Sequence, residues 1–113
     1  ITIEGAQELL DNDVAQYSDL LASTCPNLSQ RQFDAIVSLI YNIGWYNFRH
    51  SMTFVVCRNI NITYTPLEVA RRIVLWTKAG GQVVLGLQKR RVIEANYFLG
   101  KEHFELINGE IIG

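Results

Sequence analysis

A double glycine lies at the centre of the stretch Trp76-Thr77-Lys78-Ala79-Gly80-Gly81-Gln82-Val83-Val84-Leu85-Gly86-Leu87-Gln88-Lys89-Arg90-Arg91. The pattern predicts one helix that ends near Trp76 and Lys78, and another that begins near Leu87. Gly80 and Gly81 can adopt backbone angles that other residues avoid, which favours a sharp turn beside an exposed indole. Such a loop is typical of a binding cleft. A helix cap followed by a simple connector is the other interpretation of the same pattern.

The clearest helix start lies upstream of that loop. Ser29 and Gln32 have the spacing of a capping box, in which each side chain satisfies a free backbone amide. The residues from 35 to 43 are apolar almost all round, which predicts a central helix that is covered on several sides. Gly44 is expected to end this helix in a left-handed conformation. Asn42 is either satisfied locally or directed into a cleft.

Four further helices are indicated by apolar residues at three- and four-residue spacing, over about residues 3–22, 52–58, 66–77 and 87–99. We therefore expect an all-α fold, a compact bundle of about five helices around a buried central helix. Residues 1–100 would form this helical lobe, and residues 101–113 a C-terminal tail. Within the tail, Asn108 and Gly109 lie between apolar pairs and favour a short hairpin.

Composition limits the possible partners. The chain has 113 residues, 49% of them hydrophobic, and a net charge of −1. This charge balance favours neither nucleic acid nor an anionic membrane, and no apolar run is long enough for a membrane span. A helix-turn-helix that binds DNA through residues 89–91 is an alternative that the charge balance argues against.

Cys25 and Cys57 lie far apart and form no metal-binding or redox motif. We expect two free thiols, at least one of them in the core, with a single disulfide as the alternative. No metal and no cofactor is predicted.

Glu94 differs from the other carboxylates, most of which lie at helix starts or on polar faces. It follows Arg91 by three residues and Arg90 by four, so it can pair with either along a helix. That pairing would lower the pKa of Glu94 and suit a structural role better than a general acid. His50 and His103 are isolated, and no serine or cysteine has an evident base nearby.

Three segments, in this order, resemble the bacteriophage endolysins, which are phage-type lysozymes or muramidases of glycoside hydrolase family 24. Residues 2–14 are similar to the family's helix that follows the catalytic hairpin. Residues 29–44 and 76–94 are similar to two later segments, the second with Gly86, Arg90 and Glu94 in register. The resemblance covers about residues 2–100. Leu85 stands where the family usually has proline, so the loop is expected to be less rigid here.

The resemblance implies hydrolysis of the β-1,4 bond between N-acetylmuramic acid and N-acetylglucosamine in peptidoglycan. In this family the general acid is a glutamate in an N-terminal helix, followed by an aspartate or cysteine and a threonine in a β-hairpin. Glu4 is not assigned that role, because the residues around it resemble the later helix. The resemblance therefore implies a helical lobe whose catalytic β-hairpin lobe is missing, and a chain that is inactive alone.

Residues for substrate binding and support follow from the same resemblance. The candidates for saccharide contact are Tyr41, Asn42, Trp76 and Lys78, through stacking and amide hydrogen bonds. The backbone would be shaped by Gly44, Gly80, Gly81 and Gly86, and the last helix braced by Arg90, Arg91 and Glu94.

The expected partners are a peptidoglycan strand and the missing N-terminal catalytic lobe, with no nucleic acid and no membrane span. We expect production in the bacterial cytoplasm from a phage or prophage gene, and action on the cell wall. The alternative is a non-catalytic cell-wall-binding or structural prophage remnant.

Overall fold

Residues 17–113 are described by a computed structural model, and most of them are helical. Residues 17–24 form the end of the first predicted helix; its earlier part, including Glu4, lies outside the described residues. The later helices are α2 (Gln30–Ile43), α3 (Trp45–Arg49), α4 (Met52–Arg58), α5 (Pro66–Ile73) and α6 (Leu85–Leu99). A largely helical fold is therefore confirmed.

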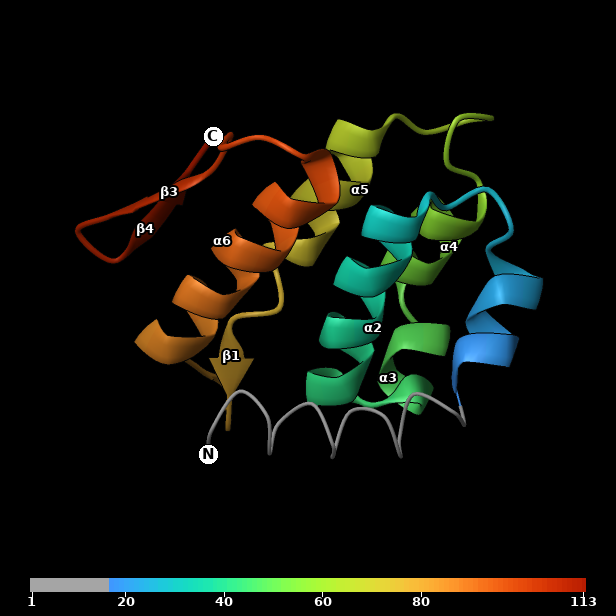
Figure 1. Cartoon of the computed structure of the whole chain (residues 1–113). Helices are drawn as coiled ribbons and strands as arrows, with labels where there is room; N and C mark the ends of the chain where they lie inside the picture. The colour runs from blue at the N-terminus through green and yellow to red at the C-terminus, as the bar shows by residue number, and fades with distance from the viewer. Residues whose placement is uncertain (1–16) are drawn as a thin grey trace, which may run out of the picture.

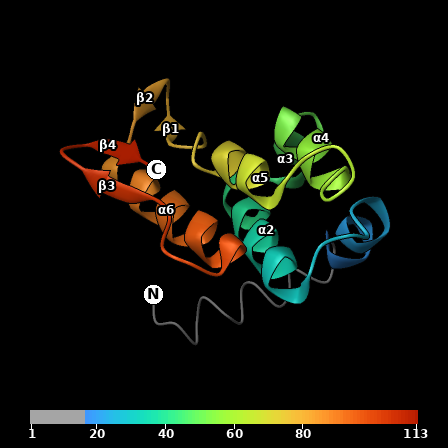
Figure 2. The same ribbon diagram turned by 90° about the horizontal axis from the view of Figure 1, so that it is seen from above.

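Helix α2 lies in the middle of the molecule, between α6 on one side and α3 and α4 on the other (Figures 1 and 2). Its buried side chains are Ala35, Ile36, Val37, Leu39 and Ile40. They pack with Leu21, Phe48, Phe54, Ile73 and Phe98 in one continuous core. Gln30, Arg31 and Asp34 remain exposed, so α2 is covered along most of its length but not at its start.

Local capping residues set the starts of several helices. Ser29 Oγ accepts from the Gln32 amide at 3.3 Å, and Gln32 Oε1 accepts from the Ser29 amide at 2.9 Å. Thr65 and Glu68 form the same reciprocal arrangement at the start of α5. Helix α4 begins after Ser51, as predicted. The capping box predicted at Ser29 is confirmed, and Thr65 adds a second one.

The Ser29 cap gives a first testable prediction. We expect Ser29→Ala to lower the free energy of unfolding by about 1 kcal/mol, because one amide of the first turn of α2 loses its partner. Chemical denaturation would measure the change. Ser23→Ala is a matched control, since the exposed Ser23 hydroxyl only donates to the Leu20 carbonyl within its own helix. An equal loss in both variants would contradict the role of the cap.

Gly44 departs from its expected conformation. Its φ is +88°, which is positive as predicted, but its ψ of 150° is that of extended backbone rather than of a left-handed helix. The reason is that Gly44 is also the residue that precedes α3. The aromatic segment Trp45–Arg49 forms this short helix, which buries Phe48.

The predicted helix up to Trp76 and Lys78 is wrong. Helix α5 ends at Ile73, and β1 (Lys78–Ala79) pairs antiparallel with β2 (Gln82–Val83). Gly80 and Gly81 have φ values of +60° and +79°, as a tight two-residue hairpin turn requires at both positions. Helix α6 begins at Leu85, so Gly86 lies in its first turn, with no positive φ, and does not shape the turn.

The C-terminal tail forms a second hairpin from β3 (Glu105–Ile107) and β4 (Glu110–Ile112), which turns at Asn108 and Gly109 with positive φ values. Asn96 of α6 attaches the tail to the helices. Its Oδ1 accepts from the amides of His103 and Phe104 at 3.1 and 2.9 Å, and its Nδ2 donates to the Phe104 carbonyl at 3.0 Å.

Candidate functional site

A hollow of about 580 Å³ lies where the end of α2, the segment after α5 and the first turn of α6 meet. It is lined by Asn42, Ile43, Asn47, Leu75, Trp76, Lys78, Ala79 and Leu87. Three of the four predicted saccharide contacts, Asn42, Trp76 and Lys78, thus lie at one site. Tyr41 is half-buried and is not part of the lining.

Asn42 is exposed at the end of α2, and Arg91 of α6 fixes the orientation of its side chain. Its Oδ1 accepts a hydrogen bond from Arg91 Nη2 at 3.1 Å. Because the carbonyl oxygen takes this bond, the Asn42 side-chain NH₂ group is left to donate. Asn42 was expected to be either a locally satisfied amide or a cleft residue. The structure shows both, because its carbonyl oxygen is bonded to Arg91 and the residue lines the hollow.

Trp76 is held through its indole N–H, which donates to Thr53 Oγ1 at 2.9 Å. Thr53 is buried on α4, so the bond ties the segment after α5 to the core. Since the polar atom of the indole is already used, Trp76 contributes its apolar ring to the hollow.

Lys78 belongs to β1 and is exposed. It pairs with Val83 across the hairpin, and the Val84 amide donates to the Thr77 carbonyl at 2.9 Å. The ammonium group is therefore carried on a short, closed hairpin rather than on a helix end.

Helix α6 carries a buried ion pair between Arg91, which contacts Asn42, and Glu94. The Arg91 side chain is completely buried, and its Nε lies 2.7 Å from Glu94 Oε1. Arg90 Nε lies 3.4 Å from Glu94 Oε2, and the Ser38 hydroxyl of α2 donates to the same oxygen. The predicted pairing of Glu94 with both arginines is confirmed.

The predicted lowering of the Glu94 pKa is wrong. Burial raises the pKa of Glu94, and the Ser38 hydrogen bond and the charges of Arg91 and Arg90 oppose that rise without cancelling it. Burial also lowers the pKa of Arg91 from its ordinary value. Arg91 lies beside Oε1 of Glu94 and the Ser38 hydroxyl donates to Oε2, and Glu94 does not line the hollow. The surroundings of Glu94 therefore suit a brace between α2 and α6.

Sequence reasoning missed Ser38, Asn47 and Thr53. Ser38 and Thr53 interact with residues that are 56 and 23 positions away, so no local spacing points to them. Asn47 donates to the Ile43 carbonyl at 2.7 Å from α3. Its position four residues after Ile43 in the sequence was the available signal.

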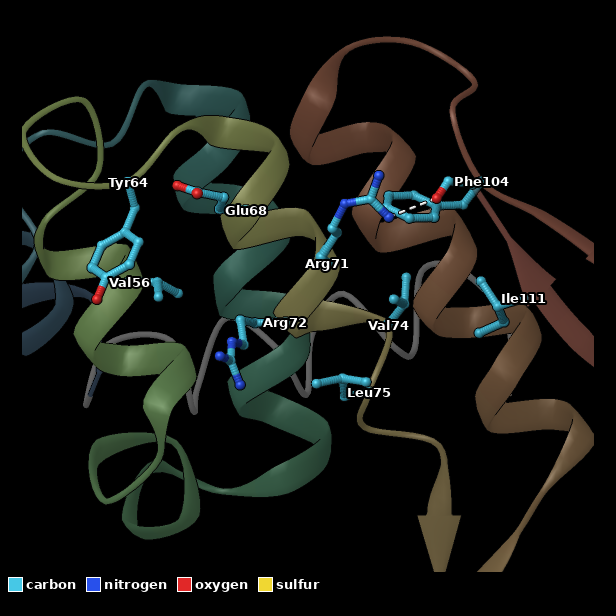
Figure 3. Close-up of a pocket in the computed structure, with 10 residues that line it drawn as sticks. Val56, Tyr64, Glu68, Arg71, Arg72, Val74, Leu75, Phe104 and Ile111 are labelled. Atoms are coloured by element: carbon cyan, nitrogen blue, oxygen red, sulfur yellow. Dashed lines mark hydrogen bonds between the residues drawn. The ribbon is translucent and has the colours of Figure 1, made fainter.

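A second hollow of about 480 Å³ lies between α4, α5 and the C-terminal hairpin, and none of the predicted residues lines it (Figure 3). In this hollow Arg71 Nη1 donates to the Gly113 carbonyl at 2.6 Å. Glu68, the carboxylate of the lining, already accepts from the Thr65 amide at 2.8 Å. This hollow therefore holds no pair of free carboxylates for glycosidic chemistry.

Cys25 and Cys57 are free and buried, as expected, and burial raises the pKa of both thiols. Within this part of the chain, no helix is long and apolar enough to cross a membrane. The same residues contain no cluster of His, Cys, Asp or Glu suited to a metal ion.

A helical fold with an amide, an indole and an ammonium group around one hollow is typical of a protein that binds a polar small ligand. Residues 1–94 match the model of the phage lysozyme family. The chain therefore belongs to the phage lysozyme family, which confirms the resemblance noted in the sequence.

Individual relatives agree with this assignment. The chain is 34% identical over 103 residues to the endolysin of Bacillus phage B103, a match that covers 90% of this chain and 38% of that protein. It is 33% identical over 99 residues to the endolysin of Bacillus phage PZA, covering 87% and 37% of the two chains. For the endolysin of Salmonella phage P22 the identity is 37% over 92 residues, covering 80% and 60%. The chain thus spans less than two thirds of the length of these three relatives.

Proposed function

We propose that this chain is the glycan-binding helical wall of a lysozyme that hydrolyses the β-1,4 bond between N-acetylmuramic acid and N-acetylglucosamine in peptidoglycan. The observation that carries the proposal is the convergence of Asn42, Trp76 and Lys78 on one hollow, in a chain of the phage lysozyme family. The expected setting is production in the bacterial cytoplasm from a phage or prophage gene, followed by action on the cell wall.

Each of the three residues has a distinct part in this proposal. The Trp76 ring offers an apolar surface to a sugar face, since its N–H is used by Thr53. The Asn42 NH₂ group donates to an acetamido or hydroxyl oxygen, while Arg91 fixes its orientation. Lys78 adds a flexible donor for sugar hydroxyls or for a carboxylate.

Cleavage needs two further groups, a carboxylic acid beside the scissile bond and a partner that positions water. None of the carboxylates of residues 17–113 lines the hollow, and Glu94 is buried against Ser38, Arg90 and Arg91. We therefore propose that the general acid belongs to a separate catalytic lobe, and that this chain alone is inactive.

Binding tests the glycan role directly. We expect Trp76→Ala to weaken binding of an N-acetylglucosamine oligomer about fivefold, because the stacking surface is lost. NMR titration would give the affinity and show whether the shifts cluster on Asn42 and Lys78. Tyr97→Ala is the matched control, since Tyr97 is an exposed aromatic residue on α6 outside the hollow. Equal binding by wild type and Trp76→Ala would contradict the proposed site.

Reconstitution tests the catalytic part of the proposal. We expect the chain alone to leave a cell-wall suspension turbid, and a mixture with a separately produced catalytic hairpin lobe of a relative to clear it. The rate of turbidity loss is the measurement. If the mixture stays inactive while the chain binds glycan, the alternative of a non-catalytic wall-binding remnant is favoured.

A further inference from the structure

A basic hollow lies at the junction of α3 and α4 and shares no residue with the Asn42 hollow. It has a volume of about 750 Å³, its charged residues are Arg49 and Arg58, and His50 also belongs to the lining. No carboxylate belongs to this lining, although the whole chain has eleven acidic and ten basic residues. Positive charge is therefore concentrated here against the overall balance.

Arg49 is held in place by an aromatic ring. Its guanidinium carbon lies 4.4 Å from the centre of the Phe54 ring. Phe54 is itself buried and packs edge-on against Phe48 at 5.7 Å. A cation placed over a ring in this way is attracted to it, which restricts the arginine before any ligand arrives.

His50 is also oriented. Its Nδ1 lies 2.9 Å from the Tyr46 carbonyl, and its ring lies 4.2 Å from the Tyr46 ring. When Nδ1 donates to that carbonyl, Nε2 remains available for a ligand. Arg58 lies one helical turn after Phe54 on α4, and it lines the same hollow as Arg49.

Neither arginine is neutralised by the protein in the part of the chain that the structure describes. The ion pairs among residues 17–113 are those of Arg90 and Arg91 with Glu94. The planar guanidinium group presents a fork of donors that matches the oxygens of a phosphate group. Two free guanidinium groups around an open hollow thus fit a ligand with phosphate charges.

We propose that the basic hollow of Arg49, His50 and Arg58 binds the phosphate groups of a soluble phosphodiester polymer. A single exposed charge pair contributes little binding free energy in water. A polymer gains more, because successive phosphates occupy both arginines and displace condensed counterions. This role is separate from glycan binding and would attach the chain to an anionic polymer.

Titration of the 113-residue chain with soluble poly(glycerol phosphate) tests the proposal. We expect chemical shift changes around Arg49 and Arg58, and an affinity that falls steeply with salt. Arg49→Gln and Arg58→Gln are each expected to weaken binding about fivefold. Each should also lower the slope of log affinity against log salt by about one. Both side chains are exposed, and a thermal unfolding curve would verify that the variants fold.

Lys89→Gln is the matched control, because it removes the same charge from an exposed position of α6 outside the basic hollow. It should leave the affinity unchanged. An equal loss in Lys89→Gln, or unchanged binding in the Arg49→Gln, Arg58→Gln double variant, would overturn the proposal. Binding to phosphatidylglycerol vesicles in preference to the soluble polymer would overturn it as well, since the phosphates would then be those of a lipid surface.

Discussion

Glu94→Ala is expected to lower the free energy of unfolding by about 3–5 kcal/mol. The substitution removes the carboxylate from a fully buried guanidinium, because Arg91 is completely buried and pairs with Glu94 at 2.7 Å. In the variant, the buried Arg91 charge would have neither water nor a carboxylate to stabilise it. The Ser38 hydroxyl loses its acceptor at the same time. Urea denaturation of wild type and variant would measure the difference.

Glu102→Ala is the control for this experiment. Glu102 is an exposed glutamate just beyond α6, and its removal should change stability by less than about 0.5 kcal/mol. A loss below about 1 kcal/mol in Glu94→Ala would show that Arg91 reaches solvent or another partner. The same variant should disturb Asn42, whose orientation depends on Arg91. A glycan titration of Glu94→Ala would reveal that coupling.

Phe48→Ala is expected to lower the free energy of unfolding by about 3–5 kcal/mol as well. Phe48 is fully buried, and its ring lies 5.7 Å from both the Trp45 and the Phe54 rings. Removing the ring leaves a cavity where α3 packs against the core, and the surrounding side chains relax only partly into it. Thermal or urea unfolding would measure the loss.

Tyr46→Ala provides a matched control within the same helix. Tyr46 is 72% exposed, so its removal should cost less than about 0.5 kcal/mol of stability. Similar losses in the two variants would mean that α3 contributes through its helical backbone rather than through the buried ring of Phe48.

Much of the helical framework was predictable because its signals are local. The capping boxes of Ser29 and Thr65 and the start of α4 after Ser51 depend on residues three positions apart. The turn at Asn108 and Gly109 is equally local, since both positions need positive φ.

The hairpin around Gly80 and Gly81 was not predicted, because two structures share its pattern. A double glycine after an apolar helix suits a helix cap, and it suits the two-residue turn of a hairpin equally well. The pairing of Lys78 with Val83 shows that the chain forms the hairpin. The residues before the double glycine do not strongly favour either the cap or the hairpin. The end of α5 at Ile73 was missed because Val74 and Trp76 continue the apolar spacing of the helix beyond that residue.

The sequence by itself indicated the family, through three segments between residues 2 and 94. It also determined the main helices with their caps and the pairing of Glu94 with Arg90 and Arg91, because these depend on residues within one or two helical turns. Only the tertiary structure decided the surroundings of those residues. The bond from Arg91 to Asn42 spans 49 positions and the bond from Ser38 to Glu94 spans 56, and together they place a charged pair where water is excluded. Burial then raises the Glu94 pKa that local pairing alone would lower, since desolvation depends on every element packed around a group and not on its neighbours in sequence.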